Sequence, residues 1–381
     1  MVNSESDALQ PFAKGDIAHV AQVPVAGPEV LAPALFEAAV AEIGAWPGYA
    51  PTPLLSLPAL ADAAGVGAIL YKDEGPRFGL KSFKALGGAY AVQVLVRELG
   101  DDVGDLTVCC ATDGNHGRSV AWGAKRFGCR CVIYLHAEVS PGREAAIAAY
   151  GAEIVRVPGN YDDSVRAAAA DAAENGWHVI SDTSYDGYTE VPRQVMAGYG
   201  VIAEEIAAEL GDGPLPTHIF LQGGVGGFAA AMAVSFRNSW GMRAPRLVVV
   251  EPALADCLLR SAEAGRATEI EVEAETLMAG LSCGVPSLLA WDVLRAEASD
   301  FIAIPESFVA PTMRLLARPL GADPTIEAGE SAVAGLAGLL GAAGRPDLAA
   351  KLGLTLESRV LVVGTEGATD PELYAALLAG G

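Results

Sequence analysis

The stretch THIFLQGGVGGFAAAMAVSF, residues 217–236, indicates how this chain folds. Its first residues suit a buried strand, GGVGG (223–227) follows, and the Ala-rich remainder is typical of a helix. A strand, a glycine loop and a helix in this order belong to a βαβ unit. Closely spaced glycines before a helix also let several backbone amides approach a phosphate. A close-packing turn between strand and helix is the alternative interpretation of these residues.

The same alternation of apolar runs and helical segments continues along the chain. The other runs that suit buried strands are LTVCCA from residue 106, RCVIYLH from 130, AEIVRVP from 152, WHVISD from 177, PRLVVVEP from 245 and RVLVVGTEG from 359. Between them, SPGREAAIAAYG predicts a helix with Ser140 as its N-cap and Gly151 at its end. We therefore expect an α/β protein with two sheets. The expected division is a small, four-stranded domain over 89–198 and a large domain from 1–88 and 199–381.

Composition limits the possible functions. The 381 residues are 51% hydrophobic and 19% charged, which suits a globular, enzyme-sized protein. A net charge of -22 argues against binding to nucleic acid or to anionic membranes. We expect a cytoplasmic protein, because the chain opens with neither a targeting segment nor a membrane-spanning run. The six cysteines suggest reduced thiols and no metal site.

Lys84 ends the motif KSFK (81–84) and precedes ALGGAYAV, which predicts the opening of a buried helix. Burial lowers the pKa of a lysine and frees its lone pair for Schiff-base chemistry. An ordinary solvated lysine is the alternative, since most lysines are exposed.

The loop TDGNHG (112–117) lies between a predicted strand and a predicted helix. Amides at a helix N-terminus favour a carboxylate, and Asn115 can donate its side-chain amide to a phenolic oxygen. Asp113 is a candidate general base if an enclosed site raises its pKa. Asp, Gly and Asn are also turn residues, so a plain turn remains possible, and His116 could serve packing alone.

The loop TEG (365–367) follows the predicted strand RVLVVG. If Thr365 faced a pyridine nitrogen, its neutral hydroxyl would leave the ring unprotonated. Such a ring is a weaker electron sink, which disfavours transamination while permitting elimination of a β-substituent. A polar turn is the alternative.

A lysine amine, a phosphate cradle, a carboxylate loop and a hydroxyl for the ring nitrogen are together the parts of a pyridoxal phosphate site. The chain resembles the tryptophan synthase β-like enzymes, and within them the family of diaminopropionate ammonia-lyases. The motifs that carry this resemblance, from about residue 50 to 370, are DEGPRFGLKSFKALGGAYA, TDGNHGRSVAWGAKRFG, DTSYDGYTEVPRQVMAGY, QGGVGGFAAA, VEP, GLSCGVPS and GTEGATD. The resemblance implies two open twisted-sheet lobes with the cofactor between them.

The resemblance also implies roles for particular residues. Lys84 would carry the cofactor, and Asp113 and Asp182 would be the acidic catalytic residues. The cofactor would further be bound by Asn115, Gly223, Gly224, Val225, Gly226, Gly227 and Thr365, and the substrate by Thr112, Asp113 and His116. A lysine on one face of the cofactor and a carboxylate on the other could remove the Cα proton from either enantiomer.

The implied reaction is elimination of ammonia from D- or L-2,3-diaminopropionate, which gives pyruvate and two ammonia molecules. Alternatives are a serine or threonine dehydratase, a synthase that replaces a β-substituent, and a noncatalytic protein that binds pyridoxal phosphate. The resemblance further implies a homodimer. It also implies that Cys257 and Cys283 stand at positions where similar lyases can carry a cysteine pair, and two unpaired thiols are the expectation here.

Overall fold

The computed structural model describes residues 9–25, 27, 29–100, 103–112 and 114–380. The chain forms two compact units. The small unit consists of Leu31–Ala50 and Arg77–Val201, and the large unit of Met1–Val30, Pro51–Pro76 and Ile202–Gly381. These units are defined by packing, so the expected division at residues 88 and 198 into functional domains stays a prediction.

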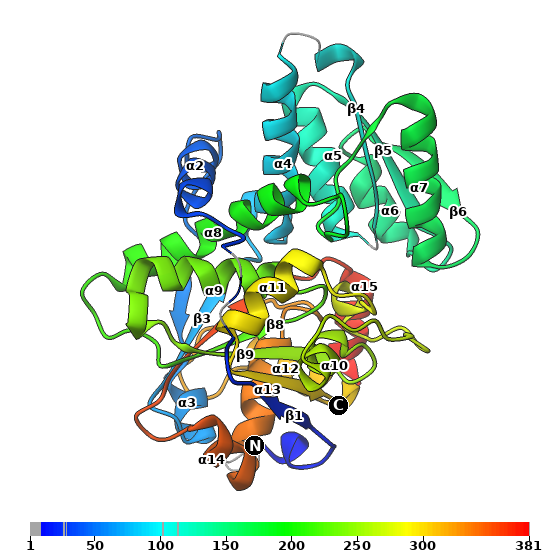
Figure 1. Cartoon of the computed structure of the whole chain (residues 1–381). Coiled ribbons are helices and arrows are strands. Elements are labelled where there is room, and N and C mark those ends of the chain that lie inside the picture. The colour runs from blue at the N-terminus through cyan, green and yellow to red at the C-terminus, as the bar shows by residue number, and fades with distance from the viewer. Residues whose placement is uncertain (1–8, 26, 28, 101–102, 113, 381) are drawn as a thin grey trace. The chain divides into compact units, whose positions relative to one another are not determined.

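The small unit contains a sheet of four strands, all parallel, in the order β6-β5-β4-β7 (Figure 1). The strands are β4 (Thr107–Ala111), β5 (Arg130–His136), β6 (Glu153–Val157) and β7 (His178–Val179). The four-stranded prediction is confirmed, although β7 keeps only two residues of the run WHVISD. Beyond β7 the backbone turns toward the candidate site described below.

Helices alternate with these strands, as the sequence predicts. Those between the strands are α5 (Asn115–Phe127), α6 (Pro141–Ala148) and α7 (Tyr161–Asn175); α2 (Pro33–Gly44) and α4 (Lys84–Leu99) precede β4, and α8 (Glu190–Leu210), after β7, contributes residues to both units. Ser140 caps α6 as predicted, because its side chain accepts a hydrogen bond from the Arg143 amide. This helix ends at Ala148, before the expected Gly151, whose φ of +87° lies in the turn that follows.

The large unit contains a seven-stranded sheet in the order β1-β10-β9-β8-β11-β3-β2. The strands are β1 (Ala18–Ala21), β2 (Leu54–Ser56), β3 (Ala68–Asp73), β8 (His218–Gln222), β9 (Arg246–Pro252), β10 (Asp300–Ile304) and β11 (Arg359–Gly364). The five inner strands run parallel, while β1 and β2 pair antiparallel at the two edges. The prediction of two sheets is therefore confirmed.

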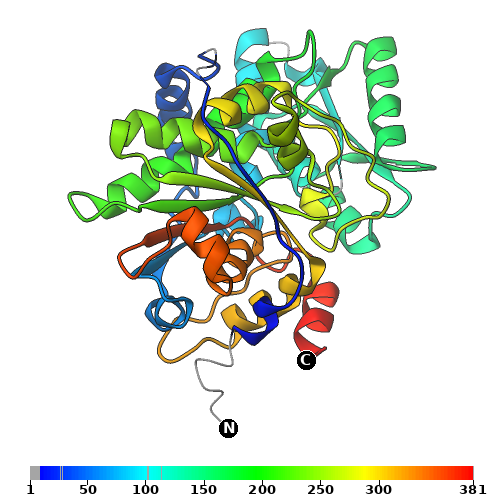
Figure 2. The ribbon, with the colours of Figure 1, turned by 60° about the horizontal axis from the view of Figure 1, so that its bottom comes forward.

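Helix α13 (Ala334–Ala343) packs against one face of this sheet, and α9 (Gly227–Trp240) and α11 (Leu288–Glu297) lie on the other (Figure 2). Two glycines let α13 lie close to the strands. A Cβ atom at Gly335 would come within 2.5 Å of the Phe220 carbonyl oxygen, and one at Gly338 within 2.9 Å of Val250.

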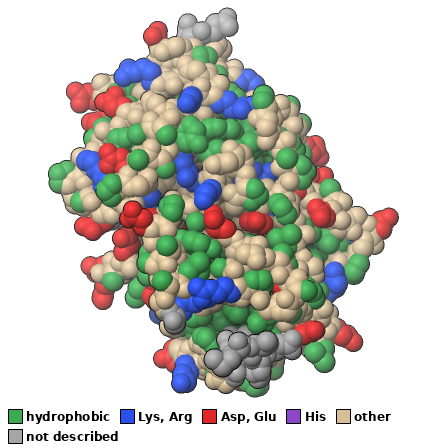
Figure 3. All heavy atoms as spheres, turned by 180° about the vertical axis from the view of Figure 1, so that it is seen from behind, with side chains coloured by type: hydrophobic (Ala, Val, Ile, Leu, Met, Phe, Trp, Pro, Cys, Tyr) green, Lys and Arg blue, Asp and Glu red, His purple; other side chains and the backbone are tan. Residues whose placement is uncertain are grey.

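Shorter helices complete both units. The α-helices are α3 (Pro58–Ala64), α10 (Cys257–Ala264), α12 (Val309–Ala317), α14 (Pro346–Leu352) and α15 (Pro371–Ala379). The 3-10 helices are Gln10–Ala13, Arg77–Gly79, Val103–Asp105, Gly241–Arg243, Ala279–Leu281 and Glu306–Phe308. In the part of the chain that the structure describes, no helix has the length and apolar character to cross a membrane. On the face drawn in Figure 3, acidic, basic and hydrophobic side chains are interspersed.

Candidate active site

Lys84 is the first residue of α4, as the sequence predicts. The amide of Lys84 donates a hydrogen bond to the Ser82 hydroxyl, and its carbonyl accepts one from the Ser119 hydroxyl on α5. Helices α4 and α5 approach closely because Gly88 has no side chain: a Cβ atom there would lie 2.4 Å from Ser119 Oγ. The start of the helix, and with it the lysine, is therefore fixed from two sides.

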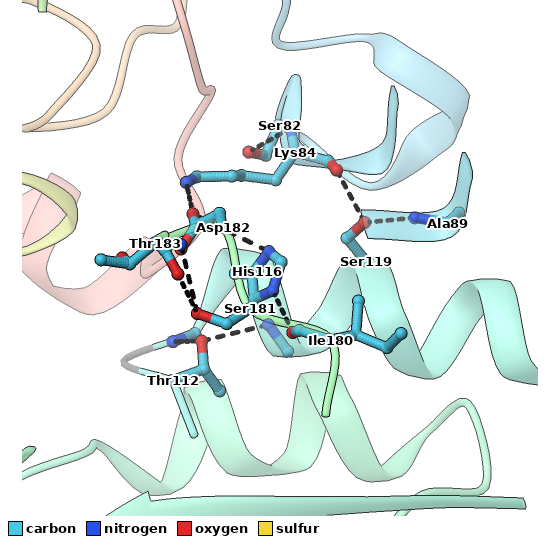
Figure 4. A network of polar contacts seen from close by, with 12 residues as sticks. Ser82, Lys84, Ala89, Thr112, His116, Ser119, Ile180, Ser181, Asp182 and Thr183 are labelled. Atoms are coloured by element: carbon cyan, nitrogen blue, oxygen red, sulfur yellow. Dashed lines mark hydrogen bonds and ion pairs between the residues drawn. The ribbon is translucent and has the colours of Figure 1, made fainter. Parts of the chain in front are cut away.

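The Lys84 side chain is mostly buried, with 21% of it exposed, and its amine donates a hydrogen bond to Asp182 Oδ2. Figure 4 shows this pair at the centre of a polar network. The amine also lies 5.5 Å from the centre of the Phe83 ring and 5.9 Å from that of Tyr199. An amine between aromatic rings and a carboxylate is shielded from bulk water, which is the setting that Schiff-base chemistry needs.

Asp182 is a stable anion in this network. Burial by itself would raise the pKa of its carboxyl, but the positive charge of Lys84 and the hydrogen bond that Lys84 donates outweigh burial. Together they hold the pKa of Asp182 well below its usual range. Asp182 therefore remains charged at neutral pH and serves as the counter-ion of Lys84.

His116 is the second residue of α5 and only 7% exposed. Its Nε2 lies 2.8 Å from the Ile180 carbonyl oxygen, and its Nδ1 lies 3.9 Å from Asp182 Oδ2 (Figure 4). Burial lowers the pKa of His116, and the positive charge of Lys84 adds to this effect against the attraction of Asp182. His116 thus belongs to the same cluster as Lys84 and Asp182.

Two further predicted residues of the TDGNHG loop, Thr112 and Asn115, have local partners. The Thr112 hydroxyl accepts hydrogen bonds of 3.0 Å from the amides of Gly114 and Gly117, so it shapes the start of α5. Asn115 Oδ1 accepts one of 3.1 Å from Arg118. Asp113 lies outside the described residues.

Tyr188 belongs to this site, although it was not among the residues predicted from the sequence. Its hydroxyl accepts a hydrogen bond of 3.0 Å from the Ser181 amide and donates one of 2.8 Å to the Val179 carbonyl. The Tyr188 ring stacks on Tyr185, with centres 5.0 Å apart. Tyr188 therefore holds the backbone immediately before Asp182. Its presence in the motif DTSYDGY was the only available signal.

In the large unit, the glycine loop 223–227 follows β8 and leads into α9, which begins at Gly227. Gly224 and Gly226 have φ values of +56° and +95°, which favour glycine. A Cβ atom at Gly223 would lie 2.5 Å from Glu251 Cγ, so a side chain is excluded there. Because the first amides of a helix lack carbonyl partners within that helix, this loop can bind a phosphate.

Glu251 lies beneath this loop and connects it to α10. Its two carboxylate oxygens accept hydrogen bonds of 2.9 and 2.8 Å from the amides of Leu258 and Leu259. Burial raises the pKa of Glu251 to about 8, despite these two donors.

Cys257 and Cys283 both lie near Gly224. The Cys257 thiol donates a weak hydrogen bond of 3.7 Å to the Gly224 carbonyl, and a Cβ atom at Gly224 would lie 3.8 Å from Cys283 Sγ. Neither cysteine forms a disulfide bond.

Thr365 follows β11, which is the neighbour of β8 in the sheet, and it is 5% exposed. The Gln222 side chain at the end of β8 donates a hydrogen bond of 2.8 Å to the Val363 carbonyl of β11. The glycine loop and Thr365 therefore stand at the carboxyl ends of two adjacent, cross-linked strands, where ligands bind in open parallel sheets. Among the described residues, no group of three or more His, Cys, Asp or Glu side chains is arranged to hold a metal ion.

The chain matches the family model described as pyridoxal-phosphate dependent enzyme over residues 45–366. Its cofactor is therefore pyridoxal phosphate, and its fold is the tryptophan synthase β-like fold that the resemblance implied. Diaminopropionate ammonia-lyase of Escherichia coli (strain K12) is 41% identical over 346 residues, which cover 86% of this chain and 87% of the relative. The chain belongs to the family of the diaminopropionate ammonia-lyases.

Crystal structures agree with this assignment. The E. coli diaminopropionate ammonia-lyase in complex with an aminoacrylate-PLP azomethine reaction intermediate is 37% identical, with a TM-score of 0.89 and coverage of 96% of this chain and 97% of that chain. The same enzyme in complex with D-serine is 36% identical, with a TM-score of 0.90 and the same coverage.

The residues of this chain fit the cofactor. The large unit offers a glycine loop from which side chains are excluded, followed by the N-terminus of a 14-residue helix, and this suits the phosphate. The small unit offers a shielded lysine amine, which suits the aldehyde.

Proposed function

We propose that this protein eliminates ammonia from 2,3-diaminopropionate and forms pyruvate and a second ammonia molecule. The observation that carries the proposal is the cluster of Lys84, Asp182 and His116, which brings a shielded lysine amine next to an anionic carboxylate. The similarity to diaminopropionate ammonia-lyase over 86% of the chain supports the same reaction.

In this proposal Lys84 binds the cofactor covalently and exchanges the Cα proton of the substrate. Bound pyridoxal phosphate supplies the electron sink that stabilises negative charge developing at the substrate Cα. The glycine loop, residues 223–227, holds the phosphate through backbone amides, and Thr365 meets the ring nitrogen with a neutral hydroxyl. Asn115 bonds the phenolic oxygen.

We further propose that the acidic residues and the TDGNHG loop act on the substrate. Asp182 keeps its negative charge near the amino groups of the substrate. Thr112 and His116 contribute to the substrate site, and Asp113 stays a proposed base on sequence grounds alone. Because a carboxylate base can stand opposite a lysine base, both D- and L-diaminopropionate are proposed substrates.

A panel of amino acids tests this proposal. Purified protein loaded with pyridoxal phosphate is given D- and L-2,3-diaminopropionate, D- and L-serine and L-threonine, and pyruvate or 2-oxobutyrate is followed by a coupled reductase. We expect diaminopropionate to give the highest kcat/KM, with two ammonia molecules per pyruvate. A higher kcat/KM for serine or threonine would identify a dehydratase instead. Turnover that requires an added nucleophile would identify a synthase, and a complete lack of turnover would leave a noncatalytic protein.

Cellular location and assembly are also proposals. We propose a cytoplasmic protein, and six cysteines that form no disulfide bond suit a reducing compartment. We propose a homodimer, which the family resemblance supports, and light scattering after size-exclusion chromatography measures the assembly directly.

A further inference from the structure

The Nδ1 atom of His116 is buried and faces a carboxylate oxygen, Asp182 Oδ2, which can only accept hydrogen bonds. A backbone carbonyl can only accept, so the contact of 2.8 Å with Ile180 places a proton on His116 Nε2. In the neutral ring, Nδ1 then carries a lone pair. Asp182 Oδ2 lies 3.9 Å from Nδ1 and is itself an acceptor, so the two atoms form no direct hydrogen bond (Figure 4).

The buried Nδ1 atom has no hydrogen-bond partner among the described residues. Buried polar atoms without partners are rare and costly, and each one calls for an explanation. An imidazolium would turn Nδ1 into a donor. However, burial, the charge of Lys84 and the positive end of the α5 dipole all oppose a charged ring at this position. The neutral ring therefore needs an external donor.

The spacing defines that donor. A single nitrogen about 2.9 Å from both atoms fits between acceptors 3.9 Å apart. An ammonium group has several N–H bonds and can donate to both atoms, whereas a hydroxyl group has a single hydrogen and leaves one acceptor unsatisfied. The carboxylate of Asp182 adds a charge that favours a cation over a neutral donor.

Lys84 supplies a donor to Asp182 in the cofactor-free chain. An ionised carboxylate oxygen has two lone pairs, so Asp182 Oδ2 can accept from Lys84 and from a second donor at the same time. The lone pair on His116 Nδ1 and the second lone pair on Asp182 Oδ2 are therefore both available to a cation from the substrate.

We propose that His116 Nδ1 and Asp182 Oδ2 form the subsite for the second ammonium group of a diamino-acid substrate. His116 is then a residue that determines specificity for an amine over a hydroxyl at Cβ. This inference rests on the proposed function, because the diamino acid is the substrate that fills the subsite. It also gives a physical reason why serine, with a hydroxyl at the same position, is the poorer substrate.

Ring nitrogen NMR tests the subsite without catalysis. The full-length, cofactor-free Lys84→Ala variant is labelled with 15N in its five histidines, and His116→Gln in the same background assigns the resonance. At pH 8.5, where a simple amine is still an ammonium, ethylammonium chloride is compared with ethanol. We expect ethylammonium to shift the Nδ1 resonance of His116 and ethanol not to do so. The added Asp182→Asn change is expected to abolish the shift.

Two NMR results would overturn the proposal. A ring that is protonated on both nitrogens at pH 8.5 before any ligand is added would make Nδ1 a donor. Equal responses to ethylammonium and ethanol, or none to either, would remove the selectivity for an ammonium group.

Substrate selectivity provides the second test. In His116→Gln the amide can still donate to the Ile180 carbonyl, but the Nδ1 acceptor is lost. We expect the ratio of kcat/KM for L-diaminopropionate to that for L-serine to fall about tenfold or more, since one lost polar contact to an ammonium has this effect. His116→Asn, whose oxygen can take the Nδ1 position, is expected to keep more of the ratio.

His218→Gln is the matched control. His218 is also 7% exposed and its Nε2 also lies near a backbone carbonyl, that of Leu352 at 3.0 Å, but it belongs to β8 in the large unit. We expect the ratio of kcat/KM for L-diaminopropionate to that for L-serine to be the same in His218→Gln as in the unmodified protein. Equal losses for both substrates in His116→Gln would make His116 a structural residue and overturn the proposal. Turnover of serine alone by the unmodified protein would refute the proposed function, and the NMR result would still decide whether the subsite binds an ammonium group.

Discussion

At the scale of single residues, the site depends on charges that compensate one another. Lys84 and Asp182 are separated by 97 intervening positions in the sequence yet form a hydrogen-bonded ion pair in a mostly buried setting. Such a pair holds the lysine side chain in place, and it also keeps the carboxylate charged. Both effects end when either partner is removed, which makes the pair directly testable.

Replacing the lysine tests its role as the cofactor attachment point. We expect Lys84→Ala to lose the visible absorbance of the lysine-cofactor Schiff base and to lower kcat/KM by at least about a thousandfold, because the covalent residue is gone. Spectra and steady-state assays of the purified variant provide the measurement. Lys125→Ala is the control, since Lys125 is exposed on α5 with its amine over the Tyr150 ring. Unchanged absorbance in Lys84→Ala would refute the assignment.

At the scale of elements, loops after neighbouring strands position the functional side chains. In the small unit, β4 and β7 pair side by side, so the loop after β4 and the loop after β7 meet at one edge of the sheet. The first loop leads to His116 and the second carries Asp182. In the large unit, β8 and β11 bring the glycine loop and Thr365 together in the same way.

Tyr188 fixes the loop after β7, and its hydroxyl is the group to remove. We expect Tyr188→Phe to lower the free energy of unfolding by about 1–3 kcal/mol, because the Ser181 amide and the Val179 carbonyl lose a shared partner. We also expect kcat/KM to fall about tenfold as Asp182 shifts relative to Lys84.

Urea unfolding and steady-state kinetics measure both effects. The stacked neighbour supplies the control: Tyr185 is 52% exposed, and Tyr185→Phe is expected to change the free energy of unfolding by less than about 0.5 kcal/mol. If both variants behaved alike, the hydroxyl of Tyr188 would have no positioning role.

The raised pKa of Glu251 predicts that the free energy of unfolding depends on pH. Burial raises its folded-state pKa to about 8, above the ordinary value of 4.5. Between these two values the folded state retains a proton that the unfolded chain has lost, so this group's contribution to stability is complete below pH 4.5 and declines as the pH rises to about 8.

Glu251→Gln removes this titration, so we expect the unmodified protein to lose at least about 1 kcal/mol more unfolding free energy between pH 5 and pH 8 than the variant does. Urea unfolding at both pH values, at constant ionic strength, measures the difference. Parallel pH profiles for the two proteins would contradict the raised pKa of Glu251.

At the scale of the whole molecule, each unit has its own sheet of mainly parallel strands and a share of the site residues at the carboxyl ends of those strands. The large unit also contains a buried ion pair between Lys72 on β3 and Glu205 on α8. Lys72 Nζ donates hydrogen bonds of 2.6 Å to Glu205 Oε2 and 2.7 Å to the Thr52 carbonyl, and both charged side chains are at most 3% exposed. This pair connects β3, the strand next to the edge strand β2, to a helix that contributes residues to both units.

Removing one charge of this pair is expected to destabilise the fold strongly. Lys72→Met should lower the free energy of unfolding by about 3–5 kcal/mol, because a buried carboxylate loses its partner. Adding Glu205→Gln should restore part of that loss, so the two changes are not additive. Thermal and urea unfolding of both single variants and of the double variant measure this double-mutant cycle.

An exposed pair serves as the control for this cycle. Arg166 and Asp163 form an ion pair of 2.5 Å on the exposed face of α7, and Arg166→Ala is expected to cost less than about 1 kcal/mol. A loss in Lys72→Met no larger than this would show that the buried pair does not contribute to stability.

Much of the fold could be predicted from local patterns. Strands such as β5 and β8 are unbroken apolar runs, and Lys84 and the glycine loop stand where a strand or loop gives way to a helix. Strand β3 was not predicted, because the buried Lys72 interrupts its apolar pattern and is compensated only by the distant Glu205. Strand β10, DFIAI, begins with the buried Asp300, whose partners His19 and Arg246 are equally remote in the sequence.

The sequence by itself determined the α/β class, the position of Lys84 at the start of a helix, and the glycine loop, because each depends on neighbouring residues. Only the tertiary structure decided that β7 lies beside β4, that His116 Nδ1 faces Asp182, and that Tyr188 holds the intervening backbone. The physical reason is that strand order and hydrogen bonds between distant residues arise from packing the whole unit, and local periodicity carries no record of them.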